Sequence, residues 1–198
     1  QQLERSLALA SDELVARNAT SGRLVFTTEL APAVAEADLV FIAVGTPTRR
    51  GDGYADLKYV YAAAEEIATH LQGYTVIVDK STVPVGTAEK VTAATKKHAT
   101  VDFDVVSNPE FLREGFAVDD FLKPDRVVVG TSSERAKKLM EELYKPFVRQ
   151  GNPIIFMDER SAELTKYAAN AFLAAKITFM NEIANFCEAV GADVDKVR

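Results

Sequence analysis

The sequence has very little of the chemistry that metal sites and disulfides need. Among its 198 residues it holds one cysteine, Cys187, and two histidines, His70 and His98. A single thiol cannot form an internal disulfide, so a reducing, cytoplasmic setting fits best. Two isolated histidines without clustered thiols do not give the spacing of a metal site. We therefore expect no bound metal.

Long apolar runs and concentrated positive charge are also missing. No apolar run approaches the ~18 residues of a membrane span, and no basic-then-apolar signal segment opens the chain. The net charge is −6 and the basic residues are scattered, which argues against nucleic acid as a partner. With 47% apolar and 26% charged residues, the composition is that of an ordinary globular protein. Because the chain begins with Gln1, we expect it to be part of a longer translation product.

Short β-type runs alternate with helical stretches along most of the chain. This alternation, with nearly continuous Val and Ile in the strands, predicts an α/β fold with a doubly wound parallel sheet covered on both faces. The predicted strands are 24–28, 38–44, 75–79, 103–107, 126–130 and 153–157. The predicted helices between them are 57–71, 87–98 and 134–144.

The last part of the chain predicts one long helix. From 159 to 190 there is neither proline nor glycine, and Gly191 follows as a plausible C-cap. About thirty helical residues span ~45 Å, which suits a connector between domains or a dimer contact. We therefore expect a sheet domain at 1–157, and the start of a second, helical dimerisation domain at 158–198.

Three loops follow strand ends, where a doubly wound sheet places its ligand crevice. They are 45–48, 81–86 and 108–115, and each combines small hydroxyl residues, proline or glycine. Any one of them could be a simple turn. Three at the same sheet edge favour a site that holds the ribose and phosphate oxygens of a cofactor.

Two pairs of side chains could carry chemistry. Glu110 and Glu114 would lie on one face if 110–114 forms a helical turn, although a solvated acidic face is the commoner outcome. Lys166 and Asn170 are also four apart, on the long helix. A lysine held near apolar surface can exchange protons at neutral pH, and the alternative is a lysine that reaches solvent.

Two other features are set aside as functional groups. Cys187 lies twenty-one residues after Lys166, hence ~30 Å along the same helix, so we interpret it as a packed, inert cysteine. The stretch from Gly51 to Gly53 contains G-x-G without the third glycine and does not directly follow a strand. We interpret it as a loop.

Several blocks of sequence, in their order and spacing, closely resemble the UDP-glucose 6-dehydrogenase family. The most specific are VDKSTVPVGT, VVSNPEFLREG with KPDRVVVG, and AELTKYAANAF. The others are DELVARN, LVFTTEL, DLVFIAVGTPT with GDGYADLKYV, and NEIANFCEAVGADV. The resemblance runs from about Asp12 to the end of the chain.

The resemblance implies a Rossmann-like domain and an NAD-dependent oxidation of the sugar C6 hydroxyl to a carboxylate in two hydride transfers. It implies UDP-glucose or a related nucleotide sugar as the substrate and a homodimer through the long helix. The implied cofactor-binding residues are Val44, Gly45, Thr46, Pro47, Ser81, Thr82 and Glu114. The implied substrate-binding residues are Glu110, Phe111, Leu112, Arg113, Lys166 and Asn170.

The resemblance also assigns catalytic roles. Lys166 and Asn170 would stabilise oxyanions at C6, and Asn170 would help to hold a water. Glu110 would act as acid and base in hydrolysing a thioester. Thr82 belongs to both the cofactor and the catalytic set.

Two parts of the family pattern are missing. The N-terminal G-x-G-x-x-G unit, which supplies the two strands between 24–28 and 38–44 in the 3-2-1-4-5-6 order, is absent, and residues before Asp12 depart from the pattern. The family's nucleophilic cysteine lies beyond the end of this chain, so an aldehyde could not be captured covalently. We therefore expect the chain alone to have no dehydrogenase activity.

Three alternatives stay open. GDP-mannose or an N-acetylated UDP-sugar could replace UDP-glucose. A β-hydroxyacid dehydrogenase also places Lys and Asn four apart, but STVPVGT with NPEFLREG argues against it. The third alternative is a non-catalytic remnant that dimerises through the long helix.

Overall fold

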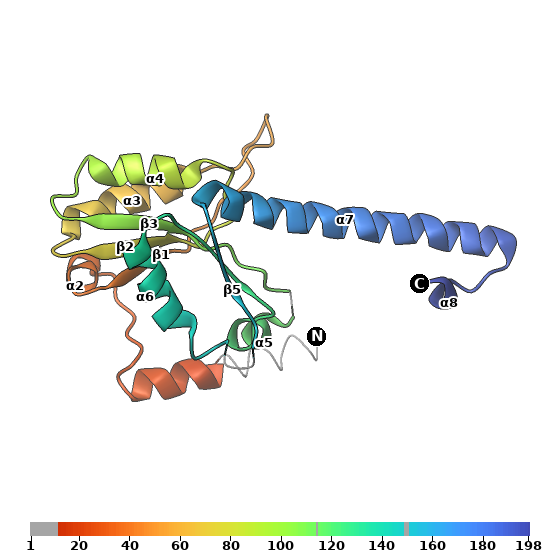
Figure 1. Cartoon of the computed structure of the whole chain (residues 1–198), viewed down its shortest axis with the longest axis horizontal. Coiled ribbons are helices and arrows are strands. Elements are labelled where there is room, and N and C mark those ends of the chain that lie inside the picture. Colours follow the sequence, from red (N-terminus) through yellow and green to blue (C-terminus); the bar gives the residue numbers. More distant parts are fainter. Residues whose placement is uncertain (1–11, 114, 149–150) are drawn as a thin grey trace.

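The computed structural model describes residues 12–113, 115–148 and 151–198. Its centre is one sheet whose five strands lie in chain order (Figure 1). The strands are β1 (Leu39–Ile42), β2 (Thr75–Asp79), β3 (Phe103–Ser107), β4 (Val127–Gly130) and β5 (Ile154–Met157). The described helices are 12–20, α2 (Leu30–Ala35), α3 (Lys58–His70), α4 (Thr87–Lys96), α5 (Ala117–Leu122), α6 (Glu134–Tyr144), α7 (Glu159–Val190) and α8 (Val194–Val197).

Alternation along the central strands divides the core into two layers. In β2, Ile77 packs on one face with residues of α3 and α4. Val76 and Val78 point to the other face and pack against α6. Because side chains alternate along a strand, a continuous run of apolar residues fills both faces at once. The predicted α/β fold with helices on both sides of the sheet is confirmed.

Most predicted element positions agree with the structure. β2, β3, α6 and α7 have the predicted bounds, and α3, α4 and the other strands differ only at their ends. Local caps explain the sharp boundaries: the Ser133 side chain caps α6, Asp158 caps α7, and Gly191 ends α7 with a φ of 74°. The helix at 12–20 and the short helices α2, α5 and α8 were not predicted.

The predicted strand at 24–28 is wrong. This segment has no strand assignment, and Val25 and Phe26 are each 74% exposed. A strand needs a neighbour to bond its backbone groups. In the part of the chain that the structure describes, β1 pairs with β2 alone, so nothing extends the sheet toward 24–28.

The predicted all-parallel pairing is also wrong at one place. β1, β2 and β3 are parallel, and β4 is parallel to β5, but β3 and β4 are antiparallel through the pair Ser107–Gly130. In its described residues, the connection 108–126 contains only the short α5 and makes no crossover, so the chain re-enters the sheet in the opposite direction.

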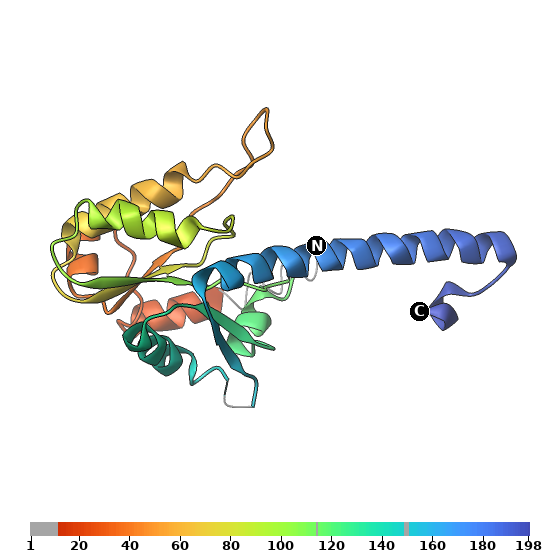
Figure 2. The same ribbon diagram turned by 45° about the horizontal axis from the view of Figure 1, so that its top comes forward.

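The long helix joins the sheet by its first turns and then leaves it. In Figures 1 and 2, α7 begins beside the sheet and projects far beyond the other elements. Its 32 residues span about 48 Å. Among the described residues, no helix combines the length and the apolar character needed to cross a membrane.

Close backbone packing fixes where α7 meets the sheet. A Cβ added at Gly130 would lie 2.5 Å from Ala162 Cβ, 2.9 Å from Glu159 Cα and 3.0 Å from Asp158 O. Two of these neighbours are backbone atoms, so only a shift of the whole helix could make room. Gly130 is therefore required for the close contact between β4 and α7.

We expect Gly130→Ala to lower the free energy of unfolding by about 1–3 kcal/mol, because α7 must move to accept the methyl group. Urea denaturation followed by circular dichroism measures this change. Gly73→Ala is the matched control, because a Cβ at Gly73 meets nothing within 4 Å. Equal stability of the two variants would contradict the proposed tight contact.

Candidate functional site

The loops that follow β1 and β2 are bonded to each other at the carboxyl edge of the sheet. The Ser81 hydroxyl donates to Val44 O at 2.9 Å, and the Thr46 hydroxyl donates to Thr82 O at 3.1 Å. These four residues all belong to the predicted cofactor set. The structure therefore brings the two halves of that set together.

A shallow pocket opens beside the first of these loops. Its lining combines the predicted cofactor residues Val44, Gly45, Thr46 and Pro47 with Tyr59, Ala62, Ala63 and Glu66 of α3. Small alanines on α3 leave space next to the loop. The resulting wall is largely apolar, and Thr46 is the loop residue that brings a hydroxyl group to it.

A second pocket, of about 330 Å³, collects the predicted substrate residues. Glu110, Phe111, Leu112, Arg113, Lys166 and Asn170 all line it. They come from the loop after β3 and from the second and third turns of α7. Lys80, Asn108 and Tyr144 complete its inner wall.

Two of these lining residues form an ion pair. Lys166 Nζ lies 2.8 Å from Glu110 Oε1, and the Lys166 residue is only 7% exposed. Glu110 Oε2 also accepts the Leu112 N–H at 2.7 Å. Lys166 therefore does not reach solvent, and its ammonium group is paired with a carboxylate.

The charge state of Glu110 follows from these contacts. Burial raises the pKa of Glu110, but the Lys166 and Leu112 hydrogen bonds and the charges of Lys166 and Lys80 outweigh it. The net pKa of Glu110 lies below its usual value, so the carboxylate is ionised near neutral pH.

The helical turn that would place Glu110 and Glu114 on one face is not formed at 110–113. These residues have no helical assignment, and the Glu110 side chain accepts the nearby Leu112 N–H instead. Arg113 pairs instead with Asp120, at 2.6 Å, and this pair lowers the pKa of Asp120 to about 2. Glu114, the other member of the predicted carboxylate pair, lies outside the described residues.

Sequence reasoning missed Lys80. Its Nζ lies 3.3 Å from Asn108 Oδ1, which also accepts the Tyr144 hydroxyl at 2.5 Å. Burial lowers the pKa of Lys80, the Glu110 charge opposes this, and the Lys166 charge adds to it. The signal was present, since Lys80 directly follows β2 inside the block VDKSTVPVGT.

A second buried carboxyl group lies beneath the cofactor loops. Asp79, at the end of β2, is 1% exposed, and its Oδ2 has no hydrogen-bond partner among the described residues. Its Oδ1 accepts the Ser81 N–H at 3.2 Å. Burial raises the pKa of Asp79 to about 7, the Ser81 N–H opposes the shift, and the Glu163 carboxylate adds to it.

The two features set aside from the sequence also have clear positions. Cys187 is buried, in the last turns of α7, on the same helix as Lys166 but far along it. The segment from Gly51 to Gly53 forms the tip of a projecting hairpin closed by the pair Thr48–Ala55. It is a loop, as predicted.

Sequence profiles of known families match nearly the whole chain. The NAD binding domain of the UDP-glucose/GDP-mannose dehydrogenase family matches residues 5–148, and the central domain of the same family matches residues 160–198. The chain belongs to the UDP-glucose/GDP-mannose dehydrogenase family. The match starts at residue 5, so the expectation that all residues before Asp12 depart from the family pattern is wrong.

Individual relatives give the same result. The chain is 59% identical over 189 residues to the UDP-glucose 6-dehydrogenase of Rhizobium meliloti (strain 1021), covering 94% of this chain and 43% of that protein. It is 52% identical over 187 residues to UDP-glucose 6-dehydrogenase TuaD of Bacillus subtilis (strain 168), covering 93% of this chain and 40% of that protein. The chain therefore spans about two fifths of the length of these relatives.

Solved structures agree with the fold. A UDP-glucose dehydrogenase from Pyrobaculum islandicum superposes with a TM-score of 0.85 at 46% identity, covering 92% of this chain and 42% of that one. A GDP-mannose dehydrogenase from Pseudomonas aeruginosa superposes with a TM-score of 0.83 at 37% identity, covering 92% of this chain and 43% of that one.

The family's cofactor is NAD, and the described residues fit part of it. The apolar wall formed by Val44, Pro47 and the α3 alanines suits a flat ring. Thr82 lies in the neighbouring loop, and its hydroxyl is of the kind that binds ribose oxygens. Thr82 is held at this place by its carbonyl bond to Thr46. The loops after β1 and β2 would hold NAD, and its nicotinamide supplies the acceptor for a hydride.

We expect the stability of Asp79→Asn, measured against that of the native chain, to increase as pH rises. The pKa of Asp79 is about 7 in the folded protein and 3.8 for an ordinary aspartate. Between these values the folded state holds a proton that the unfolded state has lost, so this group lowers stability as pH rises. Urea unfolding measures the free energy of unfolding of the variant and of the native chain. From pH 5 to pH 8 the variant should gain on the order of 3 kcal/mol relative to the native chain.

Glu188→Gln, on the projecting part of α7, controls for the loss of one negative charge. A shift of the same size in Glu188→Gln would attribute the effect to the lost charge and not to Asp79. A pH-independent difference for Asp79→Asn would show that Asp79 does not bind a proton in the folded protein.

Proposed function

We propose that this chain carries the cofactor loops and the oxyanion-stabilising residues of a UDP-glucose 6-dehydrogenase, which oxidises UDP-glucose to UDP-glucuronate in two hydride transfers. The observation that carries this proposal is the pair of the buried Lys166 with the half-buried Glu110 at 2.8 Å, in a pocket shared with Asn170. Whatever enters this pocket meets a fixed positive charge and an ionised carboxylate side by side.

Lys166 suits the stabilisation of negative charge that develops at the sugar C6 oxygen. Its ammonium group is buried and already oriented, so little reorganisation is needed when charge appears. Asn170 lies one helical turn further along α7 and lines the same pocket, so its amide can hold a hydroxyl or a water beside the Lys166 ammonium.

Glu110 suits the role of a base. The contacts described above lower the pKa of Glu110, so at neutral pH it is ionised and able to accept a proton. Its Oε1 is paired with Lys166, so we expect it to act on a water once a substrate has drawn Lys166 away. Lys80 adds a second positive charge to the same wall, which favours an anionic substrate such as a sugar nucleotide.

UDP-glucose is favoured over other nucleotide sugars by the degree of likeness. Identity to the Rhizobium meliloti UDP-glucose 6-dehydrogenase is 59%, against 37% to the Pseudomonas aeruginosa GDP-mannose dehydrogenase. GDP-mannose, an N-acetylated UDP-sugar and the non-catalytic remnant remain the alternatives.

We also propose the division into a partial NAD-binding domain at 1–157 and the start of a central helical domain at 158–198. It is supported by the family profiles, which end at 148 and resume at 160. It is also supported by the Asp158 cap, where β5 gives way to α7.

A chimera tests the catalytic proposal. Residues 12–198 replace the aligned segment of the Rhizobium meliloti enzyme, which supplies the remaining parts of the protein. With UDP-glucose and NAD, we expect two NADH per UDP-glucose from the chimera, read at 340 nm, and no steady NADH formation from this chain alone. A folded chimera without activity would contradict the proposal.

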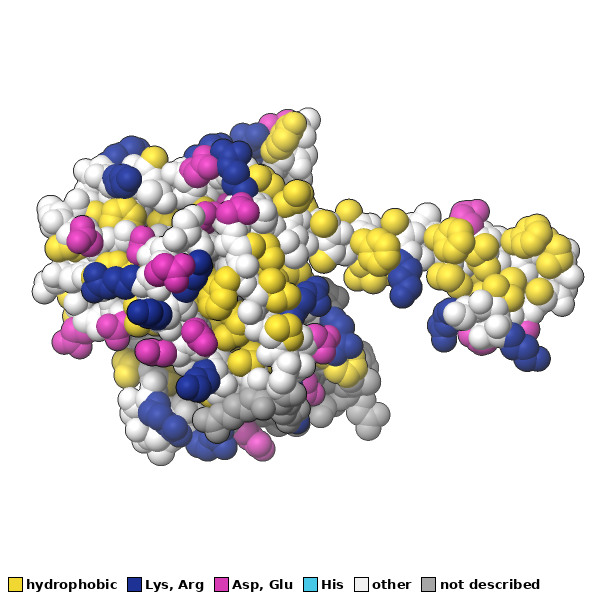
Figure 3. All heavy atoms as spheres, in the orientation of Figure 1, with side chains coloured by type: hydrophobic (Ala, Val, Ile, Leu, Met, Phe, Trp, Pro, Cys, Tyr) yellow, Lys and Arg dark blue, Asp and Glu magenta, His cyan; other side chains and the backbone are white. Residues whose placement is uncertain are grey.

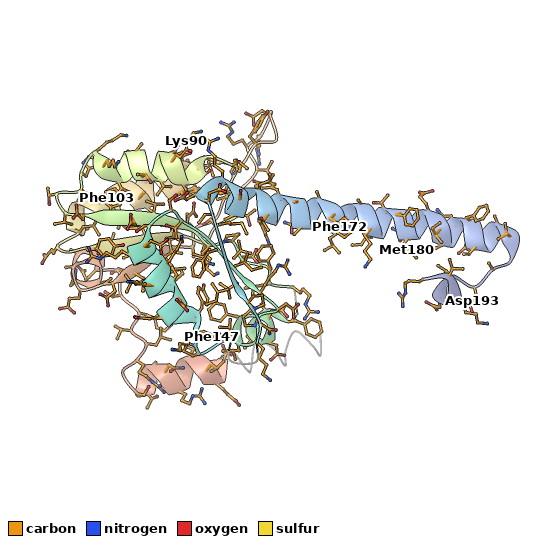
Figure 4. The ribbon with its side chains drawn as sticks, viewed as in Figure 1. Lys90, Phe103, Phe147, Phe172, Met180 and Asp193 are labelled. Carbon is orange, nitrogen blue, oxygen red and sulfur yellow. The ribbon has the colours of Figure 1, made fainter. Side chains whose placement is uncertain are left out.

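Within the chimera, Lys166→Met should lower kcat about 100- to 1000-fold, because one oriented group that stabilises the oxyanion is lost. Lys90→Met is the matched control, since Lys90 lies exposed on the outer side of α4 (Figure 4). Its kcat should stay within twofold. A Lys166→Met variant of near-native activity would remove Lys166 from the mechanism.

We further propose that the projecting part of α7 pairs with a second copy of the chain. Phe172, Phe179 and Phe186 recur every seven residues and are 72%, 62% and 64% exposed. This spacing places them in one stripe, as in helices that pack along each other. Apolar side chains cover this part of α7 in Figure 3, and Figure 4 shows Phe172 and Met180 on it, clear of the sheet.

Light scattering coupled to gel filtration tests the dimer. We expect twice the chain mass for the native chain and a single chain mass for Phe179→Asp, because the new charge would be buried in the contact. Asn185→Asp adds the same charge on the polar side of the helix and should leave the dimer intact. A monomeric native chain would contradict the proposal.

A further inference from the structure

Helix α4 begins without a cap of its own. Its N-cap residue is Gly86, which has a φ of 90° and no side chain to accept hydrogen bonds. The first N–H groups of a helix have no partner within it, and burial makes such groups costly. In α6 and α7 the local side chains of Ser133 and Asp158 meet this need.

Glu163 of α7 supplies the missing cap from a distant part of the chain. Its Oε2 accepts the Gly86 N–H at 2.5 Å, and its Oε1 accepts the Ala88 N–H at 2.7 Å. The Glu163 residue is 2% exposed. A buried carboxylate needs such donors, and bonds to a charged acceptor at a helix N-terminus are among the stronger ones.

The capped helix end is also the end of the cofactor loop. The segment 80–86 connects β2 to α4 and contains Ser81 and Thr82. On one side, Ser81 and Thr82 are bonded to the loop after β1. On the other side, Glu163 bonds the backbone at Gly86. The loop is therefore held between β1 and α7.

Glu163 and Lys166 lie three residues apart, so both buried side chains leave α7 on one face, within a single turn. Lys166 pairs with Glu110, while Glu163 bonds the loop that leads to Thr82. We propose that Glu163 is a positioning residue, which fixes the loop 80–86 against α7. It thereby holds Ser81 and Thr82 at a fixed position relative to Lys166. That this fixed position serves the binding of NAD rests on the proposed function.

Amide hydrogen exchange on the full 198-residue chain tests the positioning directly. In Glu163→Gln one carboxylate oxygen becomes a donor group that faces a backbone N–H, so the cap is broken with little change of size. We expect exchange at Gly86 and Ala88, and at the loop residues Ser81, Thr82, Val83 and Val85, to become at least 10-fold faster. Exchange in β3 should stay within twofold. Unchanged loop exchange in a folded variant would overturn the proposal.

Arg160→Gln is the matched control. Arg160 joins α7 to α4 through Glu89, at 2.6 Å, one residue beyond the capped N–H groups. Its loss should leave the loop exchange within twofold. Arg160→Gln could instead accelerate amide exchange in the loop as much as Glu163→Gln does. The effect would then be a general loosening of α7, and the specific role of Glu163 would be refuted.

The native chain gives a result even if Glu163→Gln does not fold. The Gly86 and Ala88 amides should then be protected at least 100-fold more than the amides at the exposed hairpin tip, 51–53. Free exchange at Gly86 and Ala88 in the native chain would overturn the proposal.

Kinetics of the chimera separate positioning of the cofactor loop from a merely structural role. Glu163→Gln should raise the KM for NAD about 10-fold and leave the KM for UDP-glucose within twofold. A structural defect alone would lower the active fraction and leave both KM values unchanged, and that outcome would overturn the cofactor role of Glu163. An inactive native chimera would count against the proposed function, while the exchange experiments would still decide whether Glu163 holds the loop.

Discussion

The burial of two opposite charges on one turn of α7 is the constraint on which the site depends. Glu163 and Lys166 are 2% and 7% exposed, so each needs a partner within the protein. An unpaired charge in such a place would cost several kcal/mol or lose its ionisation. Glu163 finds backbone donors at α4, and Lys166 finds the Glu110 carboxylate. Two loops that are distant in the sequence are thereby tied to the same helical turn.

The partners of these charges come from the carboxyl ends of parallel strands, where the doubly wound fold places its loops. β1, β2 and β3 end side by side, and their loops lie within bonding distance of one another. Asn108 extends this order past the end of β3, because its amide bonds Val128 O of the antiparallel neighbour β4. The pocket around Lys166 thus has a rigid inner wall before any ligand arrives.

Much of the fold could be predicted because it is local. The Val and Ile runs of β2 and β3, and the Pro- and Gly-free stretch of α7, determine their elements by themselves. The segment 24–28 has equally strong strand character, but among the described residues no strand lies beside it, so its apolar residues Val25 and Phe26 are exposed. The reversal between β3 and β4 depends on the path of a long loop, which periodicity does not describe.

The candidate site was predictable to a similar depth. Motif resemblance selected Lys166, Asn170 and the loop at 110–113, and the structure brings them into one pocket. It could not select Lys80, Asp79 or Glu163, because their importance lies in burial and in partners from other elements. A long-range cap such as the one at Gly86 leaves no local pattern except an unusual glycine at a helix start.

The contact between Gly130 and Ala162 has a further mechanical meaning. α7 is continuous and stiff, and about 30 Å of it extends beyond its anchored turns. At that length, a rotation of one degree at the sheet displaces the far end by about 0.5 Å. The close contact at Gly130, which has no side chain, thus helps to fix the direction of α7 and the position of Phe172, Phe179 and Phe186. A partner that binds the far end of α7 can therefore displace the buried Glu163 and Lys166, because the stiff helix connects them to that end.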